Sequence, residues 1–437
     1  MALGGGSFTT QNKELPGAYI NFVSASSANA GLSERGIVTM PLELDWGVQN
    51  EVFEVSSEDF RKNSQKIFGY SYNHEKMKGL RDLFINARTL YAYRLNSGGE
   101  KATNTFAAAR YTGTRGNDLK IVIQANADDS SLFDVSTLLE TVKVDSQTVS
   151  EAAELVDNDY VIFQKEAELE VTASAPLSGG ENGSVDGTAY QTYADKIEGY
   201  TYNVMGITAS DETTKKMFVS FNKRLRDELG IKFQLVIYNY PQADYMGVIS
   251  VKNKVKDEGW TEGSLVYWIT GKEAGCEVNR SCQNSVYDGE FNVDTSYTQN
   301  ELKSAVKAGE LVLHNVNGTT VRVLEDINTM VTVTDTEGAI FKDNQTVRVI
   351  DQLGNDIAVL FSTKYLGAVP NDAAGRISLW SDIVAYHREL EKIRAIENFS
   401  DSDVTVEQGE HKKSVIVSGS VTIVNAMSKL YMTITVS

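Results

Sequence analysis

The sequence is poor in cysteine, proline and basic charge. Its two cysteines among 437 residues exclude a scaffold that is held together by disulfides. Its five prolines are about 1% of the residues, against about 5% in average proteins, so the chain has no proline-rich linker. The longest apolar run, Leu265–Ile269, is far shorter than the ~20 residues of a transmembrane helix, so we expect no membrane insertion.

The charge balance is strongly acidic. The chain has 41 basic and 59 acidic residues, a formal net charge of −18. Nucleic acid is therefore not an expected partner, because phosphate binding needs a basic surface. The apolar content of 41% rises to about 49% with the 34 glycines, which is that of a folded globular chain and excludes disorder as the main state. The first residues have neither the basic nor the apolar segment of a signal peptide, so we expect no secretory signal.

The sequence offers little chemistry. No histidine pair has metal-binding spacing, and five residues separate the two cysteines, which matches no zinc motif. No glycine loop ends in Gly-Lys-Ser or Gly-Lys-Thr, and no nucleophile elbow has plausible partners. We therefore predict no catalytic residue, no metal and no cofactor, and interpret the candidate ligands as loop or surface residues. These candidates are His74, His314, His387, His411, Cys276 and Cys282.

One segment has the pattern of a strand–helix–strand unit. Tyr202–Ile207 and Phe233–Tyr238 have the composition of strands. Between them, residues 211–229 have helical periodicity, with Asp211 as N-cap and Gly230 after the C-terminus. Short connections between these elements predict a parallel βαβ unit. The residues expected on the buried helix face are Met217, Phe218, Phe221, Leu225 and Leu229.

Further strands and helices are predicted along the chain. Gly36–Met40 and Thr89–Leu95 indicate strands, and a helix is expected over residues 77–87 between them. A second apolar helix face near the C-terminus is formed by Leu379, Ile383, Tyr386, Leu390 and Ile393. Residues 100–188 are different, because they have short strand candidates, weak helical periodicity and a glycine-rich, flexible loop at 178–187.

These patterns predict a mixed α/β, multidomain chain. The α/β core has an inserted β-rich domain and is followed by a C-terminal α+β domain with extended terminal strands. The predicted parts are an arm and strand at 1–22, the core at 23–99 and 189–345, the insertion at 100–188, and the C-terminal domain at 346–437. The two terminal strands lie at residues 19–23 and 430–436. The pattern allows them to pair within their own chain or with neighbouring copies.

The order of several short motifs resembles contractile phage tail sheath proteins of Gram-positive hosts. The resemblance spans essentially the whole chain and includes sheaths of phages, defective prophages and phage-tail-like bacteriocins. The matching segments are Gly4–Phe8, Pro16–Phe22, Ser33–Gly36, Pro41–Gly47, Tyr111–Asp118, Asp244–Ile249, Tyr287–Glu290, Asp326–Thr329 and Trp380–Val384.

The resemblance implies a structural role. Such subunits stack as six-membered rings around an inner tube and contract to drive the tube through a bacterial envelope. Neighbouring subunits are joined by donated terminal strands. The implied partners are other copies of the chain, the inner tail tube protein, and baseplate and tail terminator proteins. The implied location is the bacterial cytoplasm during synthesis and a virion tail or phage-tail-like particle after assembly.

The resemblance also assigns residues. The donated strands are Tyr19, Ile20, Asn21, Phe22 and Val23 at one end, and Leu430, Tyr431, Met432, Thr433, Ile434, Thr435 and Val436 at the other. The possible tube-facing residues are Arg376, Arg388, Lys392 and Arg394. A non-contractile surface fibre or adhesin is the alternative function, and it predicts a secretion signal or strong repeats.

Overall fold

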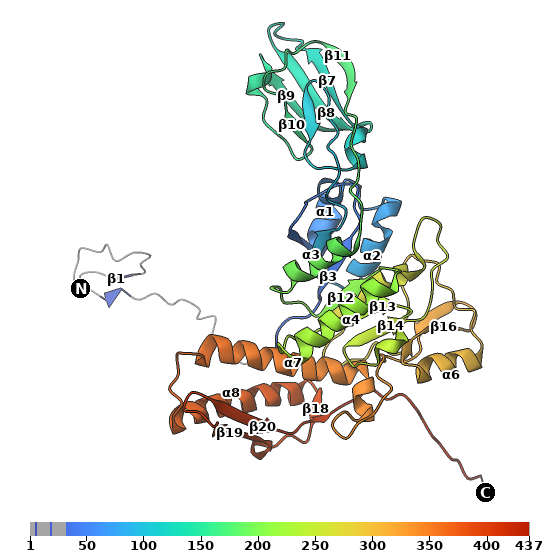
Figure 1. The fold of residues 1–437 in the computed structure, drawn as a ribbon, viewed down its shortest axis with the longest axis vertical. Helices are drawn as coiled ribbons and strands as arrows, with labels where there is room; N and C mark the ends of the chain where they lie inside the picture. The colour runs from blue at the N-terminus through green and yellow to red at the C-terminus, as the bar shows by residue number, and fades with distance from the viewer. Residues whose placement is uncertain (1–4, 7–17, 20–31, 437) are drawn as a thin grey trace. The chain divides into compact units, whose positions relative to one another are not determined.

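The computed structural model describes residues 5–6, 18–19 and 32–436 (Figure 1). One compact unit comprises Glu34–Gln352 together with the chain from Asn425 onward, and a second is built mainly from Leu353–Val424. Helices and sheets are mixed in both units, which confirms the predicted fold class.

A seven-stranded sheet forms the centre of the first unit. The strand order is β15-β14-β13-β12-β3-β5-β4, and every neighbouring pair is parallel except β4 with β5. The parallel β12–β13 pair confirms the predicted βαβ unit. The strands are β3 (Ile37–Leu42), β4 (Val52–Ser56), β5 (Thr89–Arg94), β12 (Val204–Ile207), β13 (Gln234–Tyr238), β14 (Val248–Val251) and β15 (Glu310–Leu311).

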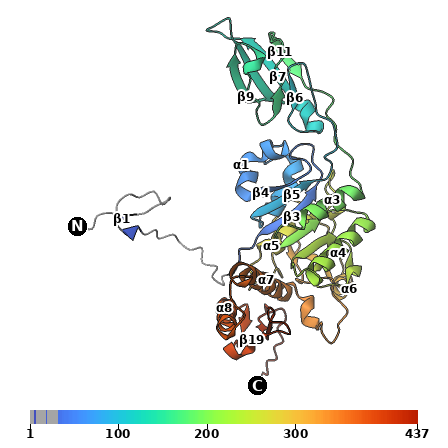
Figure 2. The same ribbon diagram turned by 60° about the vertical axis from the view of Figure 1, so that its left-hand side comes forward.

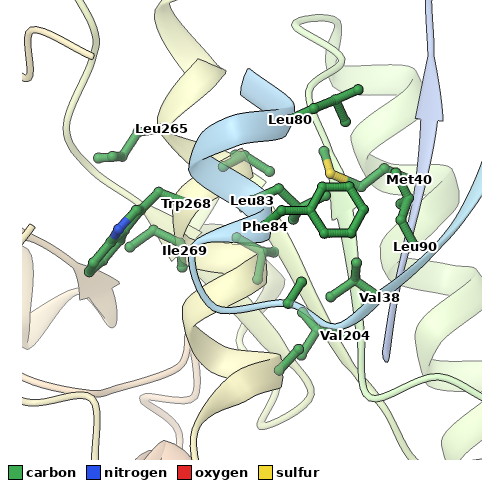
Figure 3. Close-up of a cluster of buried hydrophobic side chains, with 14 of the residues drawn as sticks. Val38, Met40, Leu80, Leu83, Phe84, Leu90, Val204, Leu265, Trp268 and Ile269 are labelled. Carbon is green, nitrogen blue, oxygen red and sulfur yellow. The ribbon is translucent and has the colours of Figure 1, made fainter. Parts of the chain in front are cut away.

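Helices bury both faces of this sheet. On one face Val204 and Val236 pack with α2 (Lys78–Phe84) and α5 (Val266–Gly275), and Figure 3 shows the side chains of this cluster. On the opposite face Met205 and Leu235 pack with α3 (Gly187–Ile197) and α4 (Glu212–Asp227). Figure 2 shows α4 and α5 on either side of the strands. Central strands that are buried on both faces are typical of parallel sheets, because crossover helices cover each face.

Helix α4 begins where the sequence predicts. The Asp211 carboxylate accepts a hydrogen bond from the Thr214 amide at 2.7 Å, which is the predicted N-cap. Phe218, Phe221 and Leu225 are buried as expected. The prediction for Leu229 was wrong, because the helix ends at Asp227 and the Leu229 side chain is 52% exposed.

Two glycines allow α2 to lie close to α5. A Cβ atom on Gly271 would come within 2.2 Å of the Leu83 carbonyl oxygen, and one on Gly275 within 2.2 Å of the Asn86 carbonyl oxygen. Any side chain at these positions would push the helices apart. Helix α2 is shorter than the predicted 77–87 helix, since a 3-10 turn over Glu75–Met77 precedes it and β5 begins at Thr89.

Residues 107–176 form two β-sheets. The first sheet has the order β11-β7-β8-β9, and the second pairs β10 with β6. Leu119, Ile121 and Val161 lie in the cluster between them and are fully buried. The strands are β6 (Ala107–Ala109), β7 (Leu119–Ala125), β8 (Phe133–Leu139), β9 (Val142–Val149), β10 (Val161–Phe163) and β11 (Thr172–Pro176).

The two segments that connect this β-region to the seven-stranded sheet, residues 96–100 and 181–183, are hydrogen-bonded to each other. Glu100 and Glu181 exchange backbone hydrogen bonds at 3.0 and 3.1 Å, and Gly183 donates to the Asn96 carbonyl at 3.1 Å. A Cβ atom on Gly99 would lie 1.9 Å from the Glu181 carbonyl oxygen. The loop predicted to be flexible at 178–187 is thus held through these backbone contacts, because glycine lets the two segments approach closely.

A tryptophan from the core lies in the hydrophobic cluster of the β-region. Trp46 is almost fully buried there, with its ring centroid 5.2 Å from that of Tyr111 and 6.3 Å from that of Tyr160. From the other direction, the Arg115 guanidinium donates to the Gly69 carbonyl at 2.7 Å. The β-region is therefore held to the core by a side chain from each side, Trp46 from the core and Arg115 from the β-region.

The second unit is small and helical, with short strands. Helix α7 (Asn344–Leu360) begins in the first unit, and its residues from Leu353 onward belong to the second. It continues as a π-helical turn over Phe361–Tyr365 and is followed by α8 (Ala373–Lys392). The predicted apolar face of α8 is buried at Leu379, Ile383 and Leu390. Two antiparallel pairs complete the unit: β18 (Ile396–Glu397) with β21 (Thr422–Ile423), and β19 (Val404–Gln408) with β20 (Val415–Gly419).

The remaining elements are β1 (Gly5–Gly6), β2 (Ala18–Tyr19), α1 (Ser57–Phe68), α6 (Gln299–Lys307) and the hairpin β16 (Leu313–Val316) with β17 (Thr320–Val323). Phe60 and Phe68 of α1, with Leu313 and Val323 of the hairpin, are buried in the same cluster as α2 and α5. No helix among the described residues has the length and apolar content needed to cross a membrane.

Candidate assembly surfaces

The C-terminal segment has no strand partner among the described residues. Residues 424–436 are extended outside any helix or strand, whereas the sequence predicts a half-buried strand at 430–436. Leu430 is 85% exposed and Val436 is 89% exposed. Such a run of exposed apolar side chains is unusual for a soluble protein and marks an interaction surface.

The start of this segment is anchored. The Ala426 amide donates to Gln345 Oε1 at 2.9 Å, and Asn425 Nδ2 donates to Thr346 Oγ1 at 3.0 Å. Gln283 Nε2 donates to Ser428 Oγ at 2.9 Å. The contacts hold the chain through Ser428, immediately before the exposed apolar run begins.

The N-terminal candidates are described only in part. Ala18–Tyr19 forms β2, which pairs in parallel with Gly5–Gly6. Tyr19 is therefore a strand residue in the structure. The other predicted donor residues of this end, Ile20, Asn21, Phe22 and Val23, lie outside the described residues.

The β19–β20 sheet is a surface that sequence reasoning did not single out. It has two strands only, so each strand has one edge that no described strand pairs with. Ile416 is 50% exposed and Val417 is 44% exposed on β20. An exposed apolar edge strand is a template for pairing with another chain. The valine and isoleucine run at 415–417 was the available signal.

The possible tube-facing residues lie at or after α8. Arg388 and Lys392 are four residues apart and share a face of the helix. Arg376 lies roughly 120° around the helix from Arg388, at 3.6 residues per turn. Arg394 follows the helix end, in a left-handed conformation with φ of 62°. The structure thus brings only Arg388 and Lys392 together.

Acidic neighbours accompany these two cations. Arg388 binds the Asp401 carboxylate with Nη2 distances of 2.7 and 2.8 Å, and Lys392 lies 3.2 Å from Glu389. These pairs are exposed, which leaves the cations accessible to a partner.

An apolar cavity of about 560 Å³ lies beside the N-terminus of α8. Phe361, Tyr365 and Leu379 contribute apolar walls, and Arg376, Lys412 and Lys413 also line it. Asn371 Nδ2 closes one side by donating to the Lys412 and Ser414 carbonyls at 3.0 and 2.8 Å. The cavity thus brings Arg376, one of the possible tube-facing residues, next to residues 412–415 from a later part of the chain.

A buried polar cluster is the main site that resembles a metal centre. Glu273, Cys282 and Asp326 bring potential ligand atoms within 4.8 Å of one another. The Arg348 guanidinium already supplies a cation there, since its Nη2 lies 2.5 Å from Glu273 and 3.5 Å from Asp326. The geometry therefore fits a buried charge cluster better than a metal ion. Cys282 lies in a loop, as the sequence interpretation allowed, although it is buried. The interpretation as a loop or surface residue was wrong for His387, which is buried within α8.

The comparisons with known proteins agree along the whole chain. Four family models match: the tail sheath protein Gp18 domain III N-terminal region at residues 35–95, the phage tail sheath beta-sandwich domain at 97–182, the central domain at 183–329, and the C-terminal domain at 336–437. The Bacillus subtilis phage-like element PBSX protein XkdK is 32% identical, with 100% of both chains covered.

Solved structures give the same result. A sheath tail protein from Desulfitobacterium hafniense is 37% identical with a TM-score of 0.82, covering 95% of this chain and 99% of that one. A sheath tail protein from Listeria innocua is 32% identical with a TM-score of 0.78, covering 91% and 93%. The contracted helical sheath of the anti-feeding prophage shares the fold at 12% identity and a TM-score of 0.59.

The protein is therefore a structural one that belongs to the phage tail sheath family. Its role is that of a tail sheath subunit, and the alternative of a surface fibre or adhesin is not favoured.

Proposed function

We propose that the chain polymerises around an inner tube by donating residues 430–436 to the β19–β20 sheet of a neighbouring copy, and that the resulting sheath contracts to drive the tube through a bacterial envelope. The single observation that carries the proposal is the exposed apolar run at 430–436, which follows an anchored start. The N-terminal residues 19–23 are the proposed second donor. The remaining proposed partners are the tube protein, baseplate proteins and the tail terminator.

Backbone chemistry supports strand donation. Residues 430–436 contain no proline, so every residue can offer both a backbone donor and an acceptor. The free edges of β19 and β20 offer complementary groups. Each added hydrogen bond contributes about 1 kcal/mol net, so one joint is modest. Because every subunit donates and receives, a connected sheath can be lost only by breaking many joints together.

Side-chain pattern supports it as well. Leu430, Met432, Ile434 and Val436 alternate with Tyr431, Thr433 and Thr435, so a paired strand would present one aliphatic face. The exposed apolar side chains of β20 supply a matching surface. Burial of each large aliphatic side chain is worth about 1.5–3 kcal/mol. These terms favour assembly against the repulsion between subunits that each carry a net charge of −18.

The tube contact is proposed for the α8 face that carries Arg388 and Lys392. Both side chains are exposed and paired only with exposed carboxylates, so an acidic partner surface can compete for them. Contraction needs no nucleotide in this scheme, because the energy is the difference between two packings of the same subunits.

Deletion of residues 430–437 tests the proposal. Expressed with the tube protein of its own particle, the parent chain is expected to form sheathed tubes in negative-stain images. The deletion variant is expected to sediment as a monomer with an unchanged unfolding midpoint, because the removed side chains are exposed.

A matched pair of variants separates strand pairing from a general effect of charge. Met432→Lys with Ile434→Lys places two charges on the aliphatic face, whereas Thr433→Lys with Thr435→Lys places them on the opposite face. We expect only the first pair to prevent assembly. Normal tubes from the deletion variant, or equal effects of the two pairs, would reject strand donation.

A further inference from the structure

The two cysteines lie together at the end of α5. Cys276 follows the helix directly, and its amide donates to the Lys272 carbonyl at 3.0 Å. The Cys282 thiol donates to the same carbonyl, with Sγ 3.7 Å from the oxygen. The Cys276 amide and the Cys282 thiol therefore share one acceptor, the Lys272 carbonyl oxygen. Cys276 is half-buried and Cys282 is buried, and both are free thiols.

Two arginines face this thiol pair. Arg348 Nη2 lies 3.8 Å from Cys282 Sγ. Arg35 Nε donates to the Cys276 carbonyl at 2.9 Å, and its Nη2 donates to the Glu273 carbonyl at 3.1 Å. Among the described residues, no carboxylate forms an ion pair with Arg35, whereas Asp351 is paired with Arg226.

The carboxylates of the cluster do not balance both arginines. Burial raises the pKa of Glu273 well above its usual value, and the negative charge of the nearby Asp326 adds to the effect. The pKa of Asp326 is lowered, chiefly by Arg348. Asp326 is therefore the carboxylate whose negative charge Arg348 stabilises, whereas burial opposes a second negative charge on Glu273. The charge of Arg35 remains for another anion.

The Cys276 thiolate can be that anion. The hydrogen bond from Cys282, followed by the charges of Arg348 and Arg35, lowers the pKa of Cys276 to about 6 against the opposing effect of burial. The pKa of Cys282 is raised well above its usual value by the same hydrogen bond and by burial. One thiol is thus poised as a nucleophile and its neighbour as a protonated partner.

We propose that Cys276 and Cys282 form a hydroperoxide-sensitive dithiol site that closes to a disulfide. The Cys276 thiolate attacks one oxygen of the hydroperoxide, the O–O bond breaks, and a sulfenic acid and hydroxide (or alkoxide) are formed. The Cys282 sulfur then attacks the sulfenic sulfur, the S–O bond breaks, and water leaves with the thiol proton. Two thiols are oxidised by two electrons, and the hydroperoxide is reduced by two.

The disulfide would fasten the loop that touches the C-terminal segment. Gln283 in this loop donates to Ser428, and Ser281 Oγ donates to Asp326 at 3.1 Å. A Cys276–Cys282 bond would tie the loop to the end of α5 across five intervening residues. Oxidation of this site would therefore modify the loop from which the C-terminal segment leaves the core. This inference does not depend on strand donation.

Peptide mapping provides a direct test on the full-length chain. Trypsin cuts after Lys272, Arg280 and Lys303, so Cys276 and Cys282 fall in the separate peptides 273–280 and 281–303. After treatment of the native protein with hydrogen peroxide, alkylation and digestion, we expect the two peptides to be joined. Reduction should separate them, and the intact chain should lose two hydrogen atoms on oxidation.

Two single variants separate the steps. Cys282→Ser should stop at a sulfenic acid on Cys276 that a dimedone-type probe labels, whereas Cys276→Ser should give no label on Cys282. Alkylation of Cys276 in a Cys282→Ala protein is expected to be slower at pH 6, because alanine cannot donate the hydrogen bond that lowers the pKa of Cys276. Circular dichroism and the unfolding midpoint establish that each variant is folded.

The pH dependence of alkylation gives an independent measurement. With iodoacetamide, the rate for Cys276 in the parent chain should rise with a midpoint at about 6, rather than the ~8.5 of a free cysteine. Arg35→Gln should move this midpoint upward. A midpoint near that of a free thiol, together with separate peptides after peroxide treatment, would overturn the proposal.

Discussion

The seven-stranded sheet and the β19–β20 sheet are built from similar aliphatic strands but end in different states. In the first, β12, β13 and β14 have neighbours on both edges and almost every side chain is buried. In the second, two strands pair with each other only, and β20 is mostly exposed. The larger sheet is complete within one chain, whereas the smaller one has unpaired edges that suit an intermolecular contact.

The same contrast holds for ion pairs. Arg226 binds Asp351 through two hydrogen bonds of 2.6 and 2.7 Å, and the two side chains are 3% and 9% exposed. Arg388 binds Asp401 with similar geometry, but the Arg388 side chain is 62% exposed and the Asp401 side chain is 43% exposed. Geometry is therefore matched while burial differs, which allows the two regions to be compared by one kind of substitution.

The largest effect is expected for Asp351→Ala. The substitution leaves the Arg226 guanidinium buried without its counter-charge, which typically costs about 3–5 kcal/mol. Urea unfolding followed by tryptophan fluorescence measures the change, because Trp46, Trp260 and Trp268 lie in the same unit as this pair.

A double variant provides the control for this prediction. Arg226→Met with Asp351→Leu removes both charges and keeps apolar volume, so it should recover most of the lost stability. If Asp351→Ala unfolds at the same urea concentration as the parent, the core tolerates an unpaired buried charge. Burial would then not decide how much an ion pair contributes to stability.

A smaller effect on the free energy of unfolding is expected when Asp82, a second buried carboxylate of the core, is replaced. Its side chain accepts hydrogen bonds from Tyr287 Oη and the Glu290 amide, each at 2.7 Å, but burial raises its pKa to about 6. The folded chain therefore holds a proton between about pH 4 and 6 that the unfolded chain has released. The contribution of Asp82 to stability must then fall as pH rises through this window.

Asp82→Asn isolates this contribution. A shift to about 6 makes the Asp82 contribution about 2 kcal/mol more favourable at pH 4.5 than at pH 7. The difference in unfolding free energy between parent and variant should change by this amount between the two pH values. A constant difference would show that Asp82 titrates as an ordinary carboxyl group.

Local patterns predicted the elements of the core well. The strand at Gly36–Met40, the strand at Thr89–Leu95 and the βαβ unit follow from periodicity and from the Asp211 cap, which are local signals. The errors have non-local causes. Leu229 was assigned to the buried face although the helix ends two residues earlier, and the glycine-rich loop was expected to be flexible although Glu100 holds it.

The candidate surfaces divide in the same way. The alternating apolar run at 430–436 is visible in the sequence because alternation of apolar and polar residues is a local pattern. The β20 edge is not, since its exposure depends on which strands fail to cover it. The dithiol cluster is also hidden, because Arg35, Arg348 and Asp326 meet there only through the fold.

The smallest effect is expected for Asp401→Ala in the exposed ion pair. Arg388 keeps its hydration when the carboxylate is removed, so little free energy is lost despite the bidentate geometry. The urea midpoint should stay within error of the parent, and amide hydrogen exchange at β19, which follows Asp401, should be unchanged. A large loss of protection there would mean that the surface pair supports the β19–β20 sheet. The difference between the two regions would then come from the role of each pair rather than from burial.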